Sequence, residues 1–443
     1  VLLSIEEDIV LSHLWRWFVG LHLVSGGLYV TLVVVLFVGL AALLVTHRDR
    51  RWFTRRVPVA VLAALVLVGL AQLALVVTKP FPDGLPWVVP LWIGLGLLGI
   101  TLAVAGWPRL RWWRRGLTVL ALVGVLLGAA NNVNVVYQPF PTVAAALQLP
   151  PYDQVDAGEV LTEDAVSTAS LADWTPPAGM PDTGALTQVD IPATASGFPA
   201  RPAWVYLPPA YLSSDRPALP VLVLLGGQPG SPRDWIDGGQ LAHRLDAWAA
   251  AHHGLAPVVV MPDDLGGEGS NPLCLDSALG KADTYLAQDV PTWITQHLQV
   301  DADHAHWAVG GFSYGGTCAL QLATNHPDLF PTLLDASGQR APTLGSAADT
   351  LQASFPGDQA ALDAVDPLHL LAARQYPDLA AYLVVGKDDD DYRPQTEEVA
   401  AALEGAGASV VTTELPGGHS WDVWGPGLEG ALPWLAQRLG LPA

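Results

Sequence analysis

Cysteine, charge and metal-binding motifs are scarce in this sequence. Cys274 and Cys318 are the only cysteines among 443 residues, which is too few for a disulfide scaffold. Charged residues make up 14% of the chain and hydrophobic residues 51%, a balance that is unusual for a soluble protein. The sequence contains no H-E-x-x-H, no C-x-x-C pair and no phosphate-binding loop, so it predicts no metal, nucleotide or other cofactor.

The sequence does not decide the state of the two cysteines. If the soluble part of the chain lies outside the cytoplasm, one disulfide between them is possible. Cys318 is expected on a helix, where a buried free thiol is equally ordinary. Both states therefore stay open at this point.

Charge is divided unevenly along the chain. Residues 1–137 contain 11 Lys/Arg and 5 Asp/Glu, a net charge of about +6, whereas the remaining residues contain 10 and 37, a net charge of about −27. A mildly basic apolar part followed by a strongly acidic polar part predicts a membrane domain joined to a soluble domain. Nucleic acid is not an expected partner, because phosphate binding needs clustered positive charge.

Long apolar runs occupy much of the first 137 residues. Four runs cover about residues 21–45, 57–77, 87–104 and 117–136, and each has room for the roughly 20 residues that cross a bilayer. No ionisable residue lies deep within a run, which favours an anchor over a transporter. The sequence therefore predicts an all-α transmembrane domain of about four helices over residues 1–137, with the lipid bilayer as its partner. Three asparagines near the end of the fourth run favour an interfacial helix end, with a small polar site as the alternative: Asn131, Asn132 and Asn134.

Arginines between the runs predict the orientation in the membrane. The second connection, residues 79–86, is nearly neutral, whereas the first and third are rich in arginine (Arg48, Arg50, Arg51, Arg55 and Arg56; Arg109, Arg111, Arg114 and Arg115). Because positive loops stay inside, these two connections are expected in the cytoplasm and both termini outside it. The sequence thus predicts a multi-pass cell-membrane protein whose C-terminal domain faces outside.

Strand-like and helix-like segments alternate in the C-terminal part of the chain. Residues 138–185 are rich in proline, alanine, aspartate and threonine without sustained periodicity, which predicts a linker. Over residues 186–443, apolar strand patterns alternate with helical patterns, including expected helices over residues 282–298 and 428–439. This alternation predicts a doubly wound α/β sheet, with its ligand site at the carboxyl ends of the strands.

A glycine-rich turn stands between an expected strand and an expected helix. Gly311-Phe-Ser-Tyr-Gly315 fits G-x-S-x-G, the elbow that presents a nucleophilic serine, here Ser313. The serine backbone is strained in such a turn, and side chains two residues to either side would collide with the neighbouring strand and helix. Gly311 and Gly315 satisfy this requirement. The helix that follows also directs its N-terminal dipole at the position where negative charge develops.

A serine nucleophile needs a base, and the base needs an orienting acid. In hydrolases of this topology the chain order is serine, acid, histidine. His419 lies in a glycine-rich loop between a strand and the last helix, and we favour it over His326 and His369. The acid is expected after the penultimate strand, which is followed by the run Asp388–Asp391. Asp389 is our choice, with Asp388 and Asp390 as alternatives.

Two backbone N–H groups are needed to bind the oxyanion of the reaction. One comes from the residue after the nucleophile, here Tyr314, and the other from the loop after an early strand. The loop Leu224-Leu-Gly-Gly-Gln-Pro-Gly230 matches that position, and Gln228 is the expected second donor.

The part of the chain that contains these motifs, about residues 186–440, resembles the esterase D-like branch of the α/β-hydrolases. That branch includes feruloyl esterases, S-formylglutathione hydrolase and the mycolyltransferases of the antigen 85 complex. The matching pieces are Ala203–Pro209, Leu224–Gly230, Asp283–Asp289, Gly311–Gly316, Gly386–Asp389 and Gly418–Trp421. The N-terminal part resembles the anchor of actinobacterial members of this family.

The resemblance implies an α/β-hydrolase fold with Ser313 as nucleophile, His419 as base and Asp389 as its acid partner. The elbow Phe-Ser-Tyr-Gly-Gly is more similar to the hydrolases than to the mycolyltransferases. We therefore expect a membrane-anchored serine esterase acting on a small-molecule, lipid or sugar ester. The alternatives are an acyltransferase that passes the acyl group to a sugar or envelope lipid, and a non-catalytic membrane scaffold. The substrate, its acyl length and the oligomeric state are not determined by the sequence.

Overall fold

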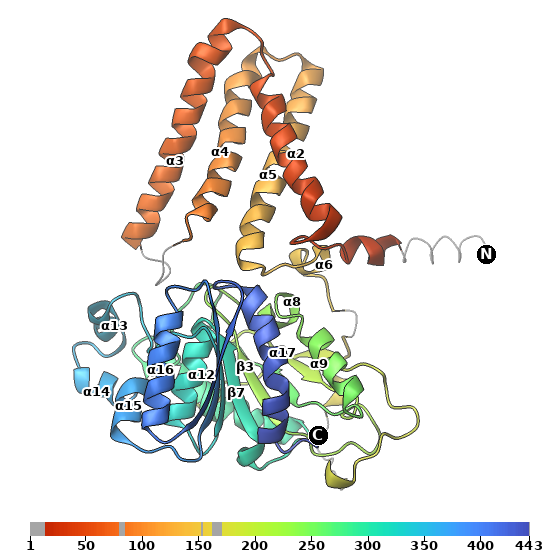
Figure 1. Ribbon diagram of the computed structural model, residues 1–443, viewed down its shortest axis with the longest axis vertical. Helices are drawn as coiled ribbons and strands as arrows, with labels where there is room; N and C mark the ends of the chain where they lie inside the picture. The colour runs from red at the N-terminus through yellow and green to blue at the C-terminus, as the bar shows by residue number, and fades with distance from the viewer. Residues whose placement is uncertain (1–13, 79–84, 152–153, 162–170, 443) are drawn as a thin grey trace, which may run out of the picture. The chain divides into compact units, whose positions relative to one another are not determined.

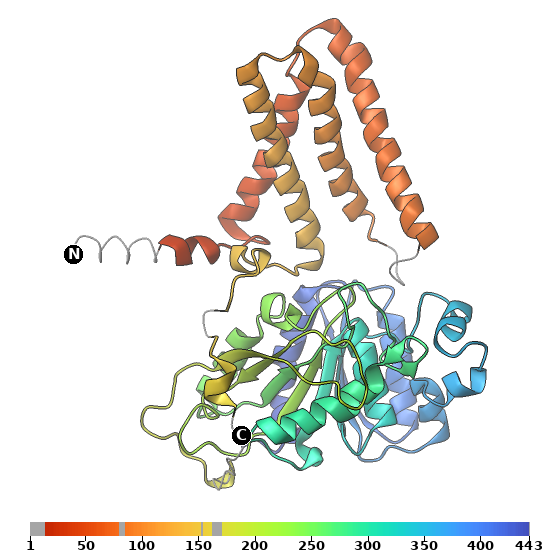
Figure 2. The same cartoon turned by 180° about the vertical axis from the view of Figure 1, so that it is seen from behind.

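The protein is described by a computed structural model over residues 14–78, 85–151, 154–161 and 171–442. The chain divides into two compact units, Val1–Leu149 and Pro150–Ala443. The N-terminal unit is helical, and the C-terminal unit is a sheet covered by helices (Figures 1 and 2).

Four long helices form most of the N-terminal unit: α2 (Gly26–Leu44), α3 (Val57–Thr78), α4 (Val88–Gly106) and α5 (Trp112–Tyr137). Each is long and apolar enough to cross a membrane. Many of their large apolar side chains are exposed, as expected of surfaces that face lipid. The helices therefore suggest membrane anchoring, in agreement with the apolar runs of the sequence. Most of the nearly neutral connection before α4, residues 79–84, lies outside the described residues.

The first long helix begins at Gly26, five residues later than the predicted run. Residues 21–23 are extended instead and pair with the chain that follows α5. The Leu23 N–H donates to Pro141 O at 2.8 Å, and the Val143 N–H donates to Leu21 O at 3.1 Å. Gly26 has a φ of +72°, which glycine adopts without strain, and this allows the chain to turn into α2.

Helices α2 and α5 pack closely through glycines. A side chain on Gly124 would collide with Val35, and one on Gly128 would collide with the Leu32 carbonyl and with Leu36. Small residues at such contacts let two helix backbones approach each other. The spacing Gly124-x-x-x-Gly128 on α5 therefore stabilises the bundle.

The three asparagines of α5 bind backbone groups near its C-terminal end. The Asn131 side chain donates to Leu23 O at 2.8 Å. Asn134 both donates to and accepts from Phe140, at 2.8 and 3.0 Å. These bonds fix the chain that leaves the helix.

The C-terminal unit contains an eight-stranded sheet in the order β1-β2-β4-β3-β7-β8-β9-β10. The pairs β1–β2 and β2–β4 are antiparallel, and every pair from β4–β3 to β9–β10 is parallel. The strands are β1 (Ala185–Val189), β2 (Ala203–Leu207), β3 (Val221–Leu225), β4 (Val258–Met261), β7 (Trp307–Phe312), β8 (Thr332–Ala336), β9 (Ala380–Gly386) and β10 (Ser409–Leu415).

Helices cover both faces of this sheet. Buried side chains of α9 (Leu241–Ala251) and α17 (Trp421–Arg438) belong to one hydrophobic cluster. Those of α11 (Val290–His297), α12 (Tyr314–Asn325) and α16 (Arg393–Gly405) belong to another. A mostly parallel sheet with one core on each face is the predicted doubly wound architecture (Figure 1).

Strand register aligns three loops at the carboxyl edge of the sheet. Leu225, the last residue of β3, pairs with Gly311 of β7, and Phe312 pairs with Ala336, the last residue of β8. The loops after β3 and β8 therefore flank the turn that follows β7 on either side.

Two helix predictions need correction. The helix expected over residues 282–298 is divided into α10 (Ala282–Thr284), the π-helical turn η4 (Tyr285–Asp289) and α11. Pro291 lies in the first turn of α11, where a missing N–H donor is tolerated. In the interior of one longer helix, the same residue would remove a backbone hydrogen bond. The last helix begins at Trp421 rather than at residue 428, and Pro426 lies inside it at an exposed position.

Candidate active site

Ser313 lies at the turn between β7 and α12. Its φ of +54° and ψ of −122° are unusual for a residue with a side chain. A Cβ on Gly311 would collide with the Gly315 backbone, and a Cβ on Gly315 would collide with the backbone at Leu225 and Gly226. The two glycines of the motif are therefore required by close backbone contacts, as the sequence predicted.

Ser313, His419 and Asp389 lie in one hydrogen-bonded chain. Ser313 Oγ is 2.8 Å from His419 Nε2, and His419 Nδ1 is 2.9 Å from Asp389 Oδ2. With Nδ1 protonated, the imidazole donates to the carboxylate and accepts the serine hydroxyl proton at Nε2. The structure thus brings together three side chains that the sequence places after three different strands.

Burial distinguishes Asp389 from the other aspartates of its run. Its side chain is 4% exposed, whereas that of Asp390 is 91% exposed and Asp388 is exposed as well. The second carboxylate oxygen, Oδ1, accepts the backbone N–H of Tyr392 at 3.3 Å. The Asp389 backbone is also fixed, since its carbonyl accepts from the Arg393 N–H at 2.9 Å.

Two aromatic rings contact His419. The Tyr392 ring is stacked on the imidazole, with the ring centroids 3.9 Å apart and the planes 25° from parallel. The Trp424 ring stands nearly perpendicular to it, at 85° and 4.9 Å. Neither residue was predicted, because nothing in a sequence with 17 tryptophans and 10 tyrosines marks the two that contact one histidine.

The loop after β3 lies directly against the serine turn. A Cβ on Gly227 would collide with the Phe312 ring, the residue before Ser313. Within the described part of the chain, neither the Gln228 nor the Tyr314 backbone N–H donates a hydrogen bond to another protein group. These are the two donors that the sequence predicted for an oxyanion.

Arg201 fixes the loop after β3 by hydrogen bonds. Its guanidinium donates to both carboxylate oxygens of Asp263 at 2.7 and 2.9 Å, and to the Gly230 carbonyl at 2.9 Å. Asp234 binds the same loop through the N–H and hydroxyl of Ser231. No local pattern predicted these residues, because Arg201 lies 62 positions from Asp263 in the sequence and an aspartate three residues after Ser231 is not a distinctive motif.

Burial raises the pKa of two carboxyl groups in this cluster. It raises the pKa of Asp234 to about 6, although the hydrogen bonds from Ser231 act in the opposite direction. Asp264 is completely buried, and burial together with the adjacent Asp263 raises its pKa well above the usual range. The hydrogen bond and charge of Asp263 raise the pKa of Arg201.

Asp335 is a further buried carboxyl group beside the serine turn. It lies near the end of β8, accepts the Gly338 N–H at 2.8 Å and leaves no room for a side chain on Gly316. Burial raises its pKa to about 7, and the bond from Gly338 offsets part of the shift. Asp335 therefore holds the loop after β8 against the beginning of α12.

Cys274 and Cys318 form a disulfide, which settles the question that the sequence left open. Two further residues of α12 bind the backbone of Cys274. The Cys274 N–H donates to the Tyr314 hydroxyl at 3.1 Å, and the Gln321 side chain donates to the Cys274 carbonyl at 3.1 Å. The loop after β4 is thus attached to α12 at three successive turns of the helix.

The remaining histidines named from the sequence lie away from the serine. His326 follows the last residue of α12 and binds Asp283 at 2.9 Å, an interaction that raises its pKa. His369 is exposed and binds Asp366. Among the described residues, the one group with metal-ligand geometry is Asp264 with the two cysteines, whose sulfur atoms are bonded to each other.

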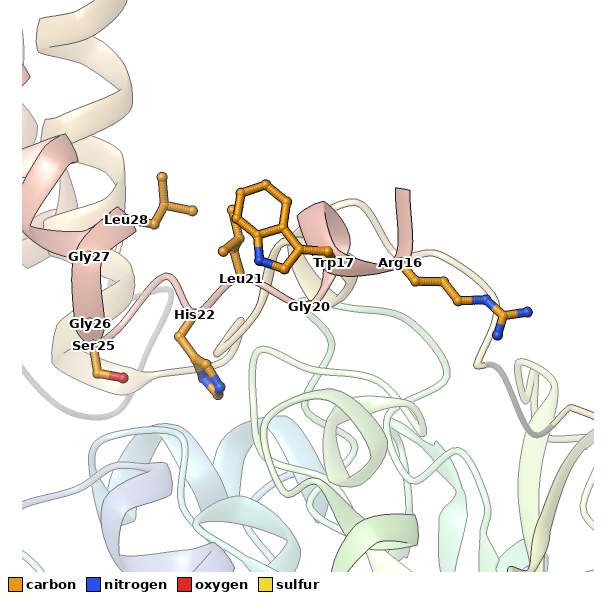
Figure 3. A pocket seen from close by; sticks show the side chains of 9 residues that line it. All are labelled: Arg16, Trp17, Gly20, Leu21, His22, Ser25, Gly26, Gly27 and Leu28. Carbon is orange, nitrogen blue, oxygen red and sulfur yellow. The ribbon is translucent and has the colours of Figure 1, made fainter. Parts of the chain in front are cut away.

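A cavity of about 380 Å³ lies at the start of α2 in the N-terminal unit. Figure 3 shows its lining side chains, of which Arg16 and His22 point in different directions rather than toward a common centre. We therefore assign no ligand to this cavity.

Comparison with known proteins places the C-terminal unit among esterases. The family model described as "Putative esterase" matches residues 200–435, a range that contains Ser313, Asp389 and His419. An uncharacterized protein of Corynebacterium glutamicum is 36% identical over 431 residues, covering 94% of this chain and 97% of its own length. That relative therefore aligns with both units.

Solved structures are similar to part of this chain. A ferulic acid esterase matches with a TM-score of 0.50 and 20% identity, covering 59% of this chain and all of its own. An S-formylglutathione hydrolase from Agrobacterium tumefaciens matches with a TM-score of 0.45 and 22% identity, covering 54% of this chain and 90% of its own. The first of these shows the α/β-hydrolase fold.

Proposed function

The chain belongs to the esterase family and is a serine hydrolase, and from this premise we propose that Ser313, His419 and Asp389 form its catalytic triad. The observation that carries the proposal is the continuous hydrogen-bonded chain from Asp389 through His419 to Ser313 Oγ. A non-catalytic scaffold would not need a serine held at positive φ beside a correctly spaced imidazole.

The proposed reaction proceeds through an acyl-enzyme. Ser313 Oγ attacks the ester carbonyl while its proton passes to His419 Nε2, and Asp389 stabilises the resulting imidazolium as a carboxylate. The backbone N–H groups of Gln228 and Tyr314 bind the oxyanion. His419 then gives its proton to the departing alcohol, and a water molecule activated by the same imidazole releases the carboxylic acid.

We also propose that the catalytic unit lies outside the cytoplasm on a membrane anchor. In this proposal residues 1–137 form the anchor, residues 138–185 the connection and residues 186–443 the esterase domain. Four apolar helices and the arginine-rich connections support it. The disulfide gives independent support, because such bonds persist in oxidising compartments and are rare in the cytosol.

Hydrolysis of a short-chain nitrophenyl ester by the full-length, detergent-solubilised protein tests the proposed activity. Ser313→Ala is expected to lower kcat/KM by at least about 1,000-fold, because the acyl-enzyme cannot form. Ser409→Ala, at an exposed serine, serves as the matched control and should retain wild-type activity. Equal activity of wild type and Ser313→Ala would contradict the proposal.

The same assay distinguishes hydrolysis from acyl transfer. With a sugar or glycerol present as acceptor, a hydrolase releases free acid in proportion to the nitrophenol that it forms. An acyl-acceptor ester as the main product would instead assign the chain to acyl transfer through the same Ser313 intermediate.

A further inference from the structure

The imidazole of His419 is held by aromatic rings as well as by hydrogen bonds. Tyr392 covers one face of it at a centroid distance of 3.9 Å, and Trp424 meets it nearly at right angles at 4.9 Å. Both rings are buried, with 5% and 4% of their surface exposed, whereas the His419 side chain is 24% exposed. Two fixed rings therefore restrict an imidazole that reaches toward solvent.

The Tyr392 ring is positioned by the same turn that carries the proposed acid. Tyr392 follows Asp389 by three residues, and its N–H donates to Asp389 Oδ1 at 3.3 Å. The other carboxylate oxygen of Asp389 binds His419 Nδ1. One turn at the start of α16 thus supplies both the carboxylate at the edge of the imidazole and the ring on its face.

The Trp424 ring connects the imidazole to the serine turn. It packs against the Phe312 ring with centroids 4.6 Å apart, and Phe312 directly precedes Ser313. The rings of Tyr392, His419, Trp424 and Phe312 thus form a continuous row of contacts. A change in the orientation of the imidazole would require these buried rings to move.

We propose that Tyr392 is a positioning residue for His419, and this inference rests on the proposed function of that histidine as the base. Hydrogen bonds at Nδ1 and Nε2 fix the edges of the imidazole, and the stacked ring fixes its plane. An aromatic face also stabilises a cation placed over it. Tyr392 therefore favours the imidazolium that forms when the Ser313 proton moves to Nε2, and its hydroxyl exchanges no proton in this step.

The surroundings of the imidazole allow this contribution to be measured. Within the described part of the chain, Asp389 is the one charged side chain bonded to His419, and the other neighbours are Ser313 and the two aromatic rings. A substitution at Tyr392 changes the stacked face and leaves both side chains that bond His419 in place.

The test compares Tyr392→Phe, which keeps an aromatic face, with Tyr392→Met, which fills similar volume without one. Nitrophenyl ester hydrolysis by the full-length protein is measured from pH 5 to 9. Tyr392→Phe should stay within about twofold of wild type. Tyr392→Met should lose about tenfold in kcat with little change in KM, and the acid limb of its pH–rate profile should move about half a unit lower.

Two results would overturn the inference: wild-type kcat and pH profile in a folded Tyr392→Met protein, or equal losses in both variants. If Tyr392→Met does not fold, Tyr392→Leu takes its place, and Tyr392→Phe still has to retain activity. Ser313→Ala separates this inference from the proposed function. Activity in Ser313→Ala contradicts the function itself, whereas its loss beside an unchanged Tyr392→Met contradicts the positioning role alone.

Discussion

Four consecutive aspartates follow β9, and burial separates Asp389 from its neighbours on either side. A buried carboxylate bonded to an imidazole holds the ring in the tautomer that accepts a proton at Nε2. Asp389→Asn is therefore expected to lower kcat by about 1,000-fold or more, measured by ester hydrolysis. Asp388→Asn and Asp390→Asn, at exposed positions, should remain within about twofold of wild type. Equal losses in the three variants would contradict the assignment.

Asp335 predicts a pH dependence of stability. Its pKa rises from 3.8 to about 7 on folding, so the folded protein binds this proton more tightly than the unfolded chain does. The stabilisation is present below about pH 4 and is lost as the pH rises to about 7, a change on the order of 4 kcal/mol. Asp335→Asn keeps the acceptor for the Gly338 N–H and removes the titration.

The expected result is a Tm that changes less between pH 5 and pH 8 in Asp335→Asn than in the wild type. The Tm of Asp335→Asn relative to that of the wild type should therefore be higher at pH 8 than at pH 5. Asp378→Asn, at an exposed position, is the matched control and should follow the wild-type curve. If the Tm of Asp335→Asn and that of the wild type change with pH in parallel, the Asp335 carboxyl group is not responsible for the pH dependence of stability.

The sequence predicted the residues that a local motif marks and missed those that only the fold brings together. Ser313 was identified by its flanking glycines, and His419 and Asp389 by their places after successive strands. Arg201 lies before β2 and Asp263 after β4, so no local pattern joins them to the loop after β3. Tyr392 directly follows the aspartate run, but its stacking on His419 depends on how two loops meet.

The helix after the nucleophile is attached to the loop after β4 by the disulfide between Cys274 and Cys318. The two cysteines are separated by 44 residues, and closing a loop of that size in the unfolded chain is expected to stabilise the protein by about 2–4 kcal/mol. Cys274→Ala/Cys318→Ala is therefore expected to have a lower Tm than the wild type, measured by thermal unfolding of the full-length protein.

Reductant provides the matched control for this prediction. Wild-type protein that is denatured and refolded in the presence of a thiol reductant should have a lower Tm. The same treatment should leave the Tm of the double variant unchanged. An equal Tm for wild type and double variant under oxidising conditions would contradict a stabilising role for this bond.

At the level of secondary structure, the alternation of patterns was sufficient for the sheet but not for every helix. Most of the parallel strands are short apolar runs that stand out between polar segments, so the doubly wound architecture could be predicted. The helices over Ala347–Ser354, Gln359–Asp363 and Pro367–Ala373 are short and mostly partly exposed, and they carry little periodic signal. The extended pairing before α2 depends on a strand-like contact with residues more than 100 positions away.

The whole chain combines four apolar helices with an acidic hydrolase unit, and its orientation is a prediction of the arginine distribution. A phosphatase reporter that is active only after export should be active when fused at the C-terminus. It should be inactive when fused within the first arginine-rich connection, residues 46–56. The opposite pattern of activities would place the catalytic unit in the cytoplasm and would be inconsistent with the proposed topology.

The central claim is that Ser313 is a nucleophile activated by His419. The most direct measurement is reaction of the detergent-solubilised, full-length protein with a fluorophosphonate, followed by mass spectrometry of the labelled peptide. The account predicts one adduct on the peptide containing Ser313, no adduct in Ser313→Ala and unchanged labelling in Ser409→Ala. A folded wild-type protein that is not labelled, or that is labelled at another residue, would contradict it.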